Sequence, residues 1–413
     1  MAHSRLQFLQ RALRFGAIGS MAPTLMMDAR LAERALAAGA RDHGKNIMVV
    51  VQLAGGNDGL NTIIPYGDGR YYQDRPTLGI PQRQVLHIDN HLGFHPSLTG
   101  LKTLYDRGQV AVVQGVGYPS PNLSHFRSTD IWQSAQPIGA LDSGWLGRFL
   151  DSAMAEVRNP LKALSLGPLL PKAFWAARTQ VPAVQSIESF RFLAGLPAEA
   201  EARRLIGAFQ QIYGVANATE GPYLSLVQLG EASAYQATIQ LARVTNTTPP
   251  GVQYPDTGLA GQLKLVSQII ATNLGTRVFM VTQGGYDDHA DEASAHPQLL
   301  AELGNAVAAF YADLAAQGRA SQVLLMTFSE FGRRPQENGS HGTDHGTAAP
   351  MLVVGGAVKG GVYGQTPSLT DLDNGNLRFS TDFRSVYSTV LASWMGADPT
   401  AAVLGTFPTI PFV

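Results

Sequence analysis

Five short apolar runs alternate with segments of helical periodicity, and this alternation restricts the fold more than any other feature of the chain. The runs span 46–53, 109–116, 277–282, 322–328 and 351–354. Each is apolar along most of its length rather than at every second position, which is typical of strands buried on both faces. Helical patterns occupy 97–107, 144–157, 296–317 and 382–395. The pattern predicts an α/β fold with a doubly wound, mostly parallel sheet and helices on both faces.

One long segment lacks this alternation. Residues 181–256 carry helical patterns and no strong strand, so we expect a helical insertion on the sheet. Residues 44–413 would form one α/β domain that includes this insertion. Hydrophobic residues make up 45% of the chain, which supplies enough apolar side chains for a large core.

The first 43 residues have features of an export signal. Arg5, Arg11 and Arg14 precede or interrupt an apolar stretch, and small residues follow where a signal peptidase could cut. Ser4 stands where a twin-arginine signal has its first arginine. We expect a periplasmic or secreted protein, with an N-terminal helix on a cytoplasmic protein as the alternative. No other run of about 20 uninterrupted apolar residues occurs, so no stable membrane span is expected.

Composition excludes several kinds of site. The chain has no cysteine, which rules out disulfides, thiolate metal sites and a cysteine nucleophile. Its formal net charge is -1 and no basic stripe is present, so nucleic acid is not an expected partner. Any metal ion must therefore be held by oxygen and imidazole ligands.

Ligand-type side chains cluster at the ends of the predicted strands. Asp58 follows the first strand, Asp287, Asp288 and His289 follow the third, Glu330 follows the fourth, and His345 precedes the fifth. Ligands in open α/β sheets bind outside the carboxyl ends of the strands, so we expect these residues to converge there. Clustered carboxylates repel one another unless a cation is present. The sequence thus predicts a divalent ion, with Zn, Mn or Fe suiting mixed ligands and Ca or Mg suiting fewer histidines.

Four further residues are candidates for contact with a substrate. Ser124 precedes a helical segment and could be a nucleophile, although a helix cap is the favoured alternative for a lone serine. Arg127, Arg333 and Arg334 could clamp an oxyanion, because guanidinium matches phosphate and sulfate geometry. Surface salt bridging is the alternative for each arginine.

Six segments together carry a family resemblance. They are LAGGNDGLNTIIPY, GVGYPSPNLSHFRSTDIWQ, GWLGRFLD, GGYDDHA, TFSEFGRRPQENGSHGTDHGTAAPMLVVGG and DFRSVYSTVLASWMG. These segments resemble an uncharacterised bacterial family, filed under a domain-of-unknown-function label, whose members often carry a twin-arginine signal. The resemblance covers nearly everything from Lys45 to Phe407. That family is grouped with the alkaline phosphatase and sulfatase superfamily, so an alkaline-phosphatase-like fold is implied.

The superfamily pattern transfers to this chain only in part. The resemblance implies that Asp58 is the first-strand metal acid and Ser124 the nucleophile. It implies that Asp287 or Asp288 with His289, and His345 before Pro350, are later ligands. Phe331 stands where a ligand histidine would be expected, and phenylalanine cannot bind a metal. One metal ion is therefore expected rather than two.

The resulting functional expectation is metal-dependent hydrolysis of a small anionic ester. Ser124 or a metal-bound water would attack a phosphate or sulfate ester. Phosphate is favoured, because the usual sulfatase nucleophile is made from cysteine. The alternative is a non-catalytic periplasmic protein that uses the metal for binding or assembly on a degenerate hydrolase fold, and Phe331 is the feature that favours it.

Overall fold

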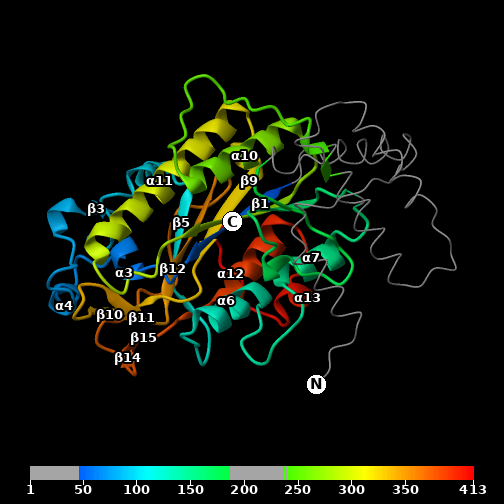
Figure 1. The fold of residues 1–413 in the computed structure, drawn as a ribbon. Helices are drawn as coiled ribbons and strands as arrows, with labels where there is room; N and C mark the ends of the chain where they lie inside the picture. Colours follow the sequence, from blue (N-terminus) through cyan, green and yellow to red (C-terminus); the bar gives the residue numbers. More distant parts are fainter. Residues whose placement is uncertain (1–45, 158, 187–236, 239) are drawn as a thin grey trace, which may run out of the picture.

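Helices cover both faces of a central sheet in the part of the chain that the structure describes (Figure 1). The computed structural model describes residues 46–157, 159–186, 237–238 and 240–413. The predicted export signal and most of the predicted insertion, residues 187–236, lie outside the described residues. The domain boundaries stay predictions.

Nine described strands form one sheet, in the order β13-β5-β12-β9-β1-β8-β6-β7, with β16 paired to β5. Their bounds are β1 Ile47–Ala54, β5 Val110–Gly117, β6 Ala163–Leu166, β7 Ala183–Val184, β8 Val278–Gly284, β9 Val323–Phe328, β12 Ala349–Gly355, β13 Gly361–Tyr363 and β16 Thr381–Asp382. Only β12 is antiparallel to its neighbours, β5 and β9. The expected mostly parallel, doubly wound sheet is confirmed.

Strand β1 shows why the predicted strands are apolar along their length. It is parallel to β8 on one side and to β9 on the other, so that Val50 is opposite both Met280 and Met326. Val49 and Val51 belong to one hydrophobic core, whereas Met48 and Val50 belong to the other. Both faces of the strand are therefore removed from water, and the hydrophobic effect favours apolar residues at every position.

The two cores are closed by different helices (Figure 1). The helices of the first core are α5 Thr99–Asp106, α10 Gly258–Thr272 and α11 Glu292–Ala316. Those of the second are α6 His125–Ser134, α7 Trp145–Ala153, α12 Phe383–Thr389 with the π-helical turn Val390–Trp394, and α13 Thr400–Val403. By length and composition, α11 could cross a membrane, but 56% of its apolar window is buried in this protein. Its Leu300, Leu303 and Phe310 are fully buried in the core.

Several short helices and strands lie at one edge of the central sheet. They are α3 Gly59–Thr62, α4 Gly69–Asp74, the three-stranded sheet of β2 Ile63–Ile64, β4 Gly93–Phe94 and β3 Leu86–His87, the hairpin of β10 Arg333–Glu337 and β11 Thr343–His345, and the pair β14 Leu372–Asp373 and β15 Asn376–Leu377. Because β12 is antiparallel to both β5 and β9, strands β1, β5, β6, β8 and β9 all run the same way. The loops that follow β1, β5, β8 and β9 thus open on one edge, where β10 and β11 also lie.

Candidate metal centre

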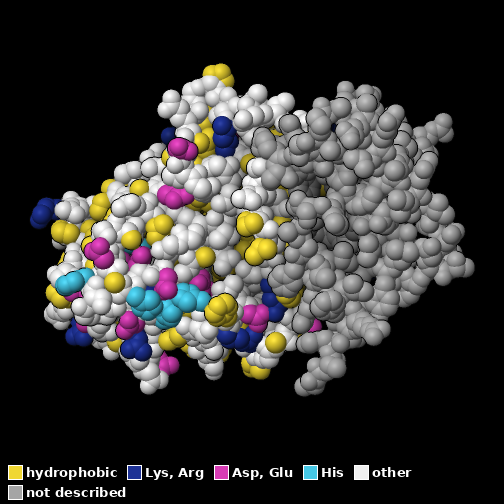
Figure 2. All heavy atoms as spheres, viewed as in Figure 1, with side chains coloured by type: hydrophobic (Ala, Val, Ile, Leu, Met, Phe, Trp, Pro, Cys, Tyr) yellow, Lys and Arg dark blue, Asp and Glu magenta, His cyan; other side chains and the backbone are white. Residues whose placement is uncertain are grey.

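Three histidine rings point their Nε2 atoms toward the carboxylate of Asp287 at this edge. His125 Nε2 lies 3.3 Å from Asp287 Oδ2. His345 Nε2 lies 3.1 Å and His289 Nε2 3.2 Å from Asp287 Oδ1. His289 Nε2 and His345 Nε2 are 2.8 Å apart. Four ligand-type side chains from α6, the loop after β8 and the end of β11 therefore converge. Figure 2 shows histidines and acidic side chains gathered on this face.

The opposite ring nitrogen of each histidine faces an acceptor. His125 Nδ1 lies 2.9 Å from Glu330 Oε1, and His345 Nδ1 lies 2.8 Å from the Leu123 carbonyl. His289 Nδ1 lies 3.5 Å from Asp344 Oδ1, a longer contact between the ring and a carboxylate. Since carboxylates and carbonyls accept hydrogen bonds, these partners can hold the proton on Nδ1 when a metal ion replaces the contact between Nε2 and Asp287. The Nε2 lone pairs are then available to a metal ion, the arrangement that metal-binding histidines usually have.

The protonation states also suit a metal ion. Partial burial alone would raise the pKa of Asp287, but hydrogen bonds from Arg333 and His345 lower it to about 2. Partial burial lowers the pKa of His345, against the effect of its bond to Asp287. At neutral pH the centre therefore offers an anionic carboxylate and a neutral imidazole, which are the forms that coordinate cations.

The spacing of the donor atoms matches a small divalent ion. Zn–N distances of about 2.0–2.1 Å place two tetrahedral ligands roughly 3.3 Å apart. Three of the four separations, 3.1, 3.2 and 3.3 Å, are close to that value, and the fourth, between His289 and His345, is 2.8 Å. Donor atoms of His125, Asp287 and His345 all lie within 4.8 Å of one another. These residues fit zinc or a similar ion.

Two neighbours fix the shape of the centre. The buried Phe331 ring packs against His345 and His125, with centroid distances of 4.3 and 4.9 Å. Gly55, with a φ of +125°, brings the loop after β1 against the backbone of Asp287, where a Cβ atom would lie only 2.5 Å from the Asp287 nitrogen. Glycine is needed here for both the backbone angle and the close approach.

The structure brings three predicted residues together, Asp287, His289 and His345, and adds His125, which the sequence analysis passed over. His125 occupies the first turn of α6, directly after Ser124. The sequence does contain a feature that indicates His125 as a metal ligand, because it is a histidine in the region that follows the predicted strand 109–116.

Asp58 faces a guanidinium instead of the histidines. Arg75 Nη1 and Nη2 bond its two carboxylate oxygens, the second at 2.9 Å, and both side chains are almost fully buried. Against the effect of burial, Arg75 holds the pKa of Asp58 well below its usual range. Asp58 Oδ1 also accepts from the Leu60 N–H and caps α3. Its role as a metal ligand stays a prediction, one that requires Arg75 to move away.

The other two predicted carboxylates are buried and differ in their relation to the centre. Glu330 is buried and accepts from the Gly55 N–H at 2.9 Å while it faces His125 Nδ1. Asp288 is buried and its Oδ2 lies 3.4 Å from His296 Nδ1. Neither carboxylate is directed at Asp287, so the geometry gives Glu330 an orienting position and leaves Asp288 as an internal partner of His296.

The candidate substrate residues have different surroundings. Ser124 is exposed at the N-cap of α6, and its hydroxyl makes no capping bond. Arg127 donates to Asp130 and to the Pro137 carbonyl. Arg333 is fully buried, and its Nη2 donates to Asp287 Oδ1 at 2.8 Å. Arg334 is half-buried, and among the described residues its Nε has no hydrogen-bond partner. Of these three arginines, Arg334 is thus the one whose donors are least committed to the protein.

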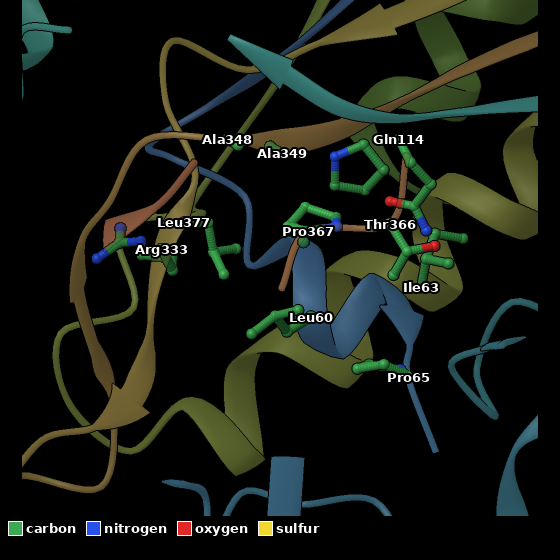
Figure 3. A pocket seen from close by; sticks show the side chains of 12 residues that line it. Leu60, Ile63, Pro65, Gln114, Arg333, Ala348, Ala349, Thr366, Pro367 and Leu377 are labelled. Atoms are coloured by element: carbon green, nitrogen blue, oxygen red, sulfur yellow. The ribbon is translucent and has the colours of Figure 1, made fainter. Parts of the chain in front are cut away.

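The pocket in Figure 3 is lined by residues other than the four ligand-type residues of the centre. It is lined mainly by apolar side chains, such as Leu60, Ile63 and Pro367, together with Gln114 from β5. Its one ionisable lining residue is Arg333, whose donors already bond the protein. The ligand-type residues lie instead on an open surface, with Asp287 49% and His289 44% exposed.

These observations define an α/β protein with a metal-type centre of histidines and a carboxylate at the carboxyl edge of its sheet. The family profile described as "Protein of unknown function (DUF1501)" matches residues 45–405, and the chain belongs to that family. The resemblance found in the sequence is thereby confirmed. No curated protein sequence matches this chain.

Several solved structures have a similar fold. A PsFucS1 sulfatase from Pseudoalteromonas sp. is 13% identical with a TM-score of 0.40, covering 93% of this chain and 74% of that one. An alkaline phosphatase superfamily protein from Vibrio parahaemolyticus is 8% identical with a TM-score of 0.40, covering 92% and 80%. The phosphonate monoester hydrolase SpPMH from Silicibacter pomeroyi is 10% identical with a TM-score of 0.40, covering 89% and 76%. The reactions in these names belong to those proteins.

Proposed function

We propose that this protein hydrolyses phosphate (or sulfate) esters with the help of one divalent metal ion held by His125, His289, His345 and Asp287. The observation that carries the proposal is the double orientation of the three histidines, whose Nδ1 atoms face acceptors while their Nε2 atoms converge on Asp287. A chance surface cluster has no reason to anchor every ring in this way. When bound, the ion would supply Lewis-acid stabilisation of the negative charge that develops on the ester oxygens.

The side chains around the centre suit the remaining tasks of ester hydrolysis. Ser124 has an exposed hydroxyl between Leu123 and His125, both of which touch the centre. Its attack would form a bond from Oγ to phosphorus while the bond from phosphorus to the alcohol oxygen breaks, and the proton that the hydroxyl loses would pass to that alcohol oxygen. Water would then attack phosphorus, the Oγ–phosphorus bond would break, and a proton of the water would return to Oγ as phosphate leaves. The Arg334 guanidinium, whose charge contributes to the lowered pKa of Asp344, would hold an anionic oxygen.

The second candidate function is metal-supported binding or assembly without turnover. Phe331 is the observation that favours it, because its ring packs at a tilt against two of the histidines and offers no donor atom. Among the described residues, no side-chain base is hydrogen-bonded to the Ser124 hydroxyl, so an activating group for this serine is not in place.

We also propose that the protein acts after export from the cytoplasm. The arginines and the apolar stretch within the first 43 residues support this. Mass spectrometry of the N-terminus, on protein recovered from a periplasmic fraction, tests it: a new N-terminus after the apolar stretch is expected, and an intact Met1 in the cytoplasmic fraction would contradict it.

Metal content and turnover, measured on the same samples, test the main proposal. The wild type should bind one equivalent of zinc and cleave an aryl phosphate, and a chelator should abolish the cleavage reversibly. His345→Ala should lose both properties. His91→Ala, which removes an exposed histidine outside the centre, should keep both. Metal binding without cleavage of any phosphate or sulfate ester would favour the second candidate, and a wild type that binds no divalent ion would contradict both.

A further inference from the structure

Three exposed apolar side chains lie around one group of charged residues next to the metal centre. They are Phe126, Ile138 and Leu169, which are 92%, 84% and 62% exposed. We call these three residues the apolar rim. Large hydrophobic residues this exposed are few in the described part of the chain, where Leu404 at 42% is the remaining example. Scattered exposed apolar residues are ordinary, but apolar residues grouped beside a polar site mark surfaces that bind ligands.

The apolar rim is held together by hydrogen bonds and ion pairs. Arg127, the neighbour of Phe126, pairs with Asp130 and donates to the carbonyl groups of Pro137 and Gly139, which flank Ile138. Lys172, three residues after Leu169, pairs with the same Asp130. The three segments that carry the rim residues are therefore tied to one carboxylate.

The rim continues directly from the metal centre. Phe126 follows His125 in the first turn of α6, so their Cα atoms are about 3.8 Å apart. Helix α6 is fixed from below, because Trp132 stacks on Phe383 and the Ser128 hydroxyl lies 2.9 Å from the Tyr118 hydroxyl. Phe126 is thus presented to solvent by a rigid element. Hydrophobic side chains adjoin the histidines on the face shown in Figure 2.

The positive charges at the rim are already paired, so they do not form a binding site for an anionic group beyond the one at the metal centre. Asp130 pairs with both Arg127 and Lys172, and the other donating nitrogen of Arg127 is bonded to carbonyl groups. A ligand that reaches from the centre onto this surface would meet an aromatic ring and aliphatic side chains. Aromatic and hydrocarbon groups gain most from such contacts, because both partners lose apolar surface to water.

We propose that the apolar rim binds the alcohol part of the substrate, so that the site takes anionic esters of aryl or hydrocarbon alcohols. Phe126 is then a specificity-determining residue that contacts the leaving group. This inference rests on the proposed function and names the substrate class for it. The anionic group would lie at the histidines while the apolar group lies along Phe126 toward Ile138.

Binding of two phosphonates to the zinc-loaded full-length protein tests the inference without turnover. Methylphosphonate and phenylphosphonate share the anionic group, and calorimetry should show phenylphosphonate binding on the order of tenfold more tightly, the effect of burying part of one ring. Phe126→Ala should bring the ratio of the two affinities close to one, and Ile138→Ala should lower it less. Leu404→Ala, which trims an exposed apolar residue outside the rim, should leave the ratio unchanged. Circular dichroism checks that each variant is folded.

Each other outcome has a distinct meaning. Equal affinities in the wild type, or a ratio that survives Phe126→Ala, would overturn the rim inference and leave the proposed function standing. Failure of both phosphonates to bind would remove the anion site, and with it the proposed function. Binding to phosphatidylcholine vesicles that Phe126→Ala abolishes, without selectivity between the phosphonates, would assign the rim to a membrane surface and overturn the inference.

Discussion

Replacing Asp58 by Asn removes the negative charge from a buried ion pair. Asp58 and Arg75 are 1% and 0% exposed, and Arg75 Nη2 donates to Asp58 Oδ1 at 2.9 Å. The same guanidinium donates to the carbonyl groups of Pro335 at 2.8 Å and Arg334 at 3.1 Å, so it joins the loop after β1 to strand β10. In Asp58→Asn, the charge of Arg75 stays buried without its bonded counter-charge, and Glu292, whose pKa burial and the charge of Asp58 raise, is the neighbouring carboxyl that could replace it in part.

The expected cost follows from that burial. Breaking a buried pair by removing one partner destabilises a protein by about 3–5 kcal/mol, because the remaining charge is not compensated. The amide oxygen of Asn can still accept from Arg75 and cap α3, so we expect a value near the lower end, about 3 kcal/mol. That is a large part of an ordinary folding free energy of about 5–15 kcal/mol. Arg75→Met combined with Asp58→Asn should cost less than the sum of the two single changes.

Guanidinium unfolding of chelator-treated protein measures this cost in the absence of metal. Asp58→Asn should lower the unfolding free energy, whereas the zinc content of the untreated, folded variant should match the wild type. Asp68→Asn is the matched control, since Asp68 also caps a helix, bonds the Arg70 N–H at 2.8 Å and is exposed. It should change stability by less than about 0.5 kcal/mol.

The opposite pattern would refute the reasoning. If Asp58→Asn loses zinc while its chelated form unfolds at the wild-type denaturant concentration, Asp58 is a ligand. Arg75 must then release it when the ion binds, and the buried pair would be a feature of the metal-free protein alone.

Three further predictions concern the surroundings of the centre. Burial and the charge of Asp58 raise the pKa of Glu292 from 4.5 to about 9, so between these values the folded chain keeps a proton that the unfolded chain releases. The unfolding free energy of the wild type should therefore fall as pH rises through this window, whereas that of Glu292→Gln should not. Unfolding experiments at pH 5, 7 and 9 measure this. An equal decline in the wild type and the variant would disprove the prediction. Gly55→Ala should destabilise the fold by more than about 1 kcal/mol and weaken zinc binding, because the added Cβ would collide with the Asp287 backbone. Gly69→Ala is the control: its added Cβ would meet no atom within 4 Å, so the same assays should show neither effect. Glu330→Gln should lower zinc affinity about 10–100-fold in competition with a chromophoric chelator, and an unchanged affinity would show that this carboxylate does not orient its histidine.

The strands that the sequence predicted are those buried on both faces. Val49 and Val50 face different cores, and the resulting apolar run is visible without any knowledge of neighbours. Strands β6 and β7 were missed because they have only four and two residues, too few for a pattern to stand out. They join the sheet by pairing with β8 and with each other, a tertiary interaction that local sequence does not encode.

The position of the centre was predictable, whereas the direction of each side chain was not. Asp287 and His345 follow or precede predicted strands, and they lie where parallel strands bring their loops together. Asp58 and Glu330 occupy equivalent places, yet the first turns to Arg75 and the second to the Gly55 N–H. Which carboxylate binds a cation and which is satisfied inside the protein depends on partners distant in the chain, such as Gly55 and Glu330, which are 275 positions apart.

The adjacent arginines Arg333 and Arg334 show the same difference between a side chain bonded inside the protein and one left for a substrate. Both were predicted to clamp a substrate, but successive residues of a strand point to opposite sides. Arg333 points inward and donates to the carbonyl groups of Gly55, Tyr286 and Thr343 as well as to Asp287, so its charge holds three loops around the centre. Under the proposed function, the positive charge that would remain for a substrate anion is that of Arg334 and of the metal ion. Affinity for an anionic ester should consequently depend on the ion much more than the number of arginines in the sequence suggests.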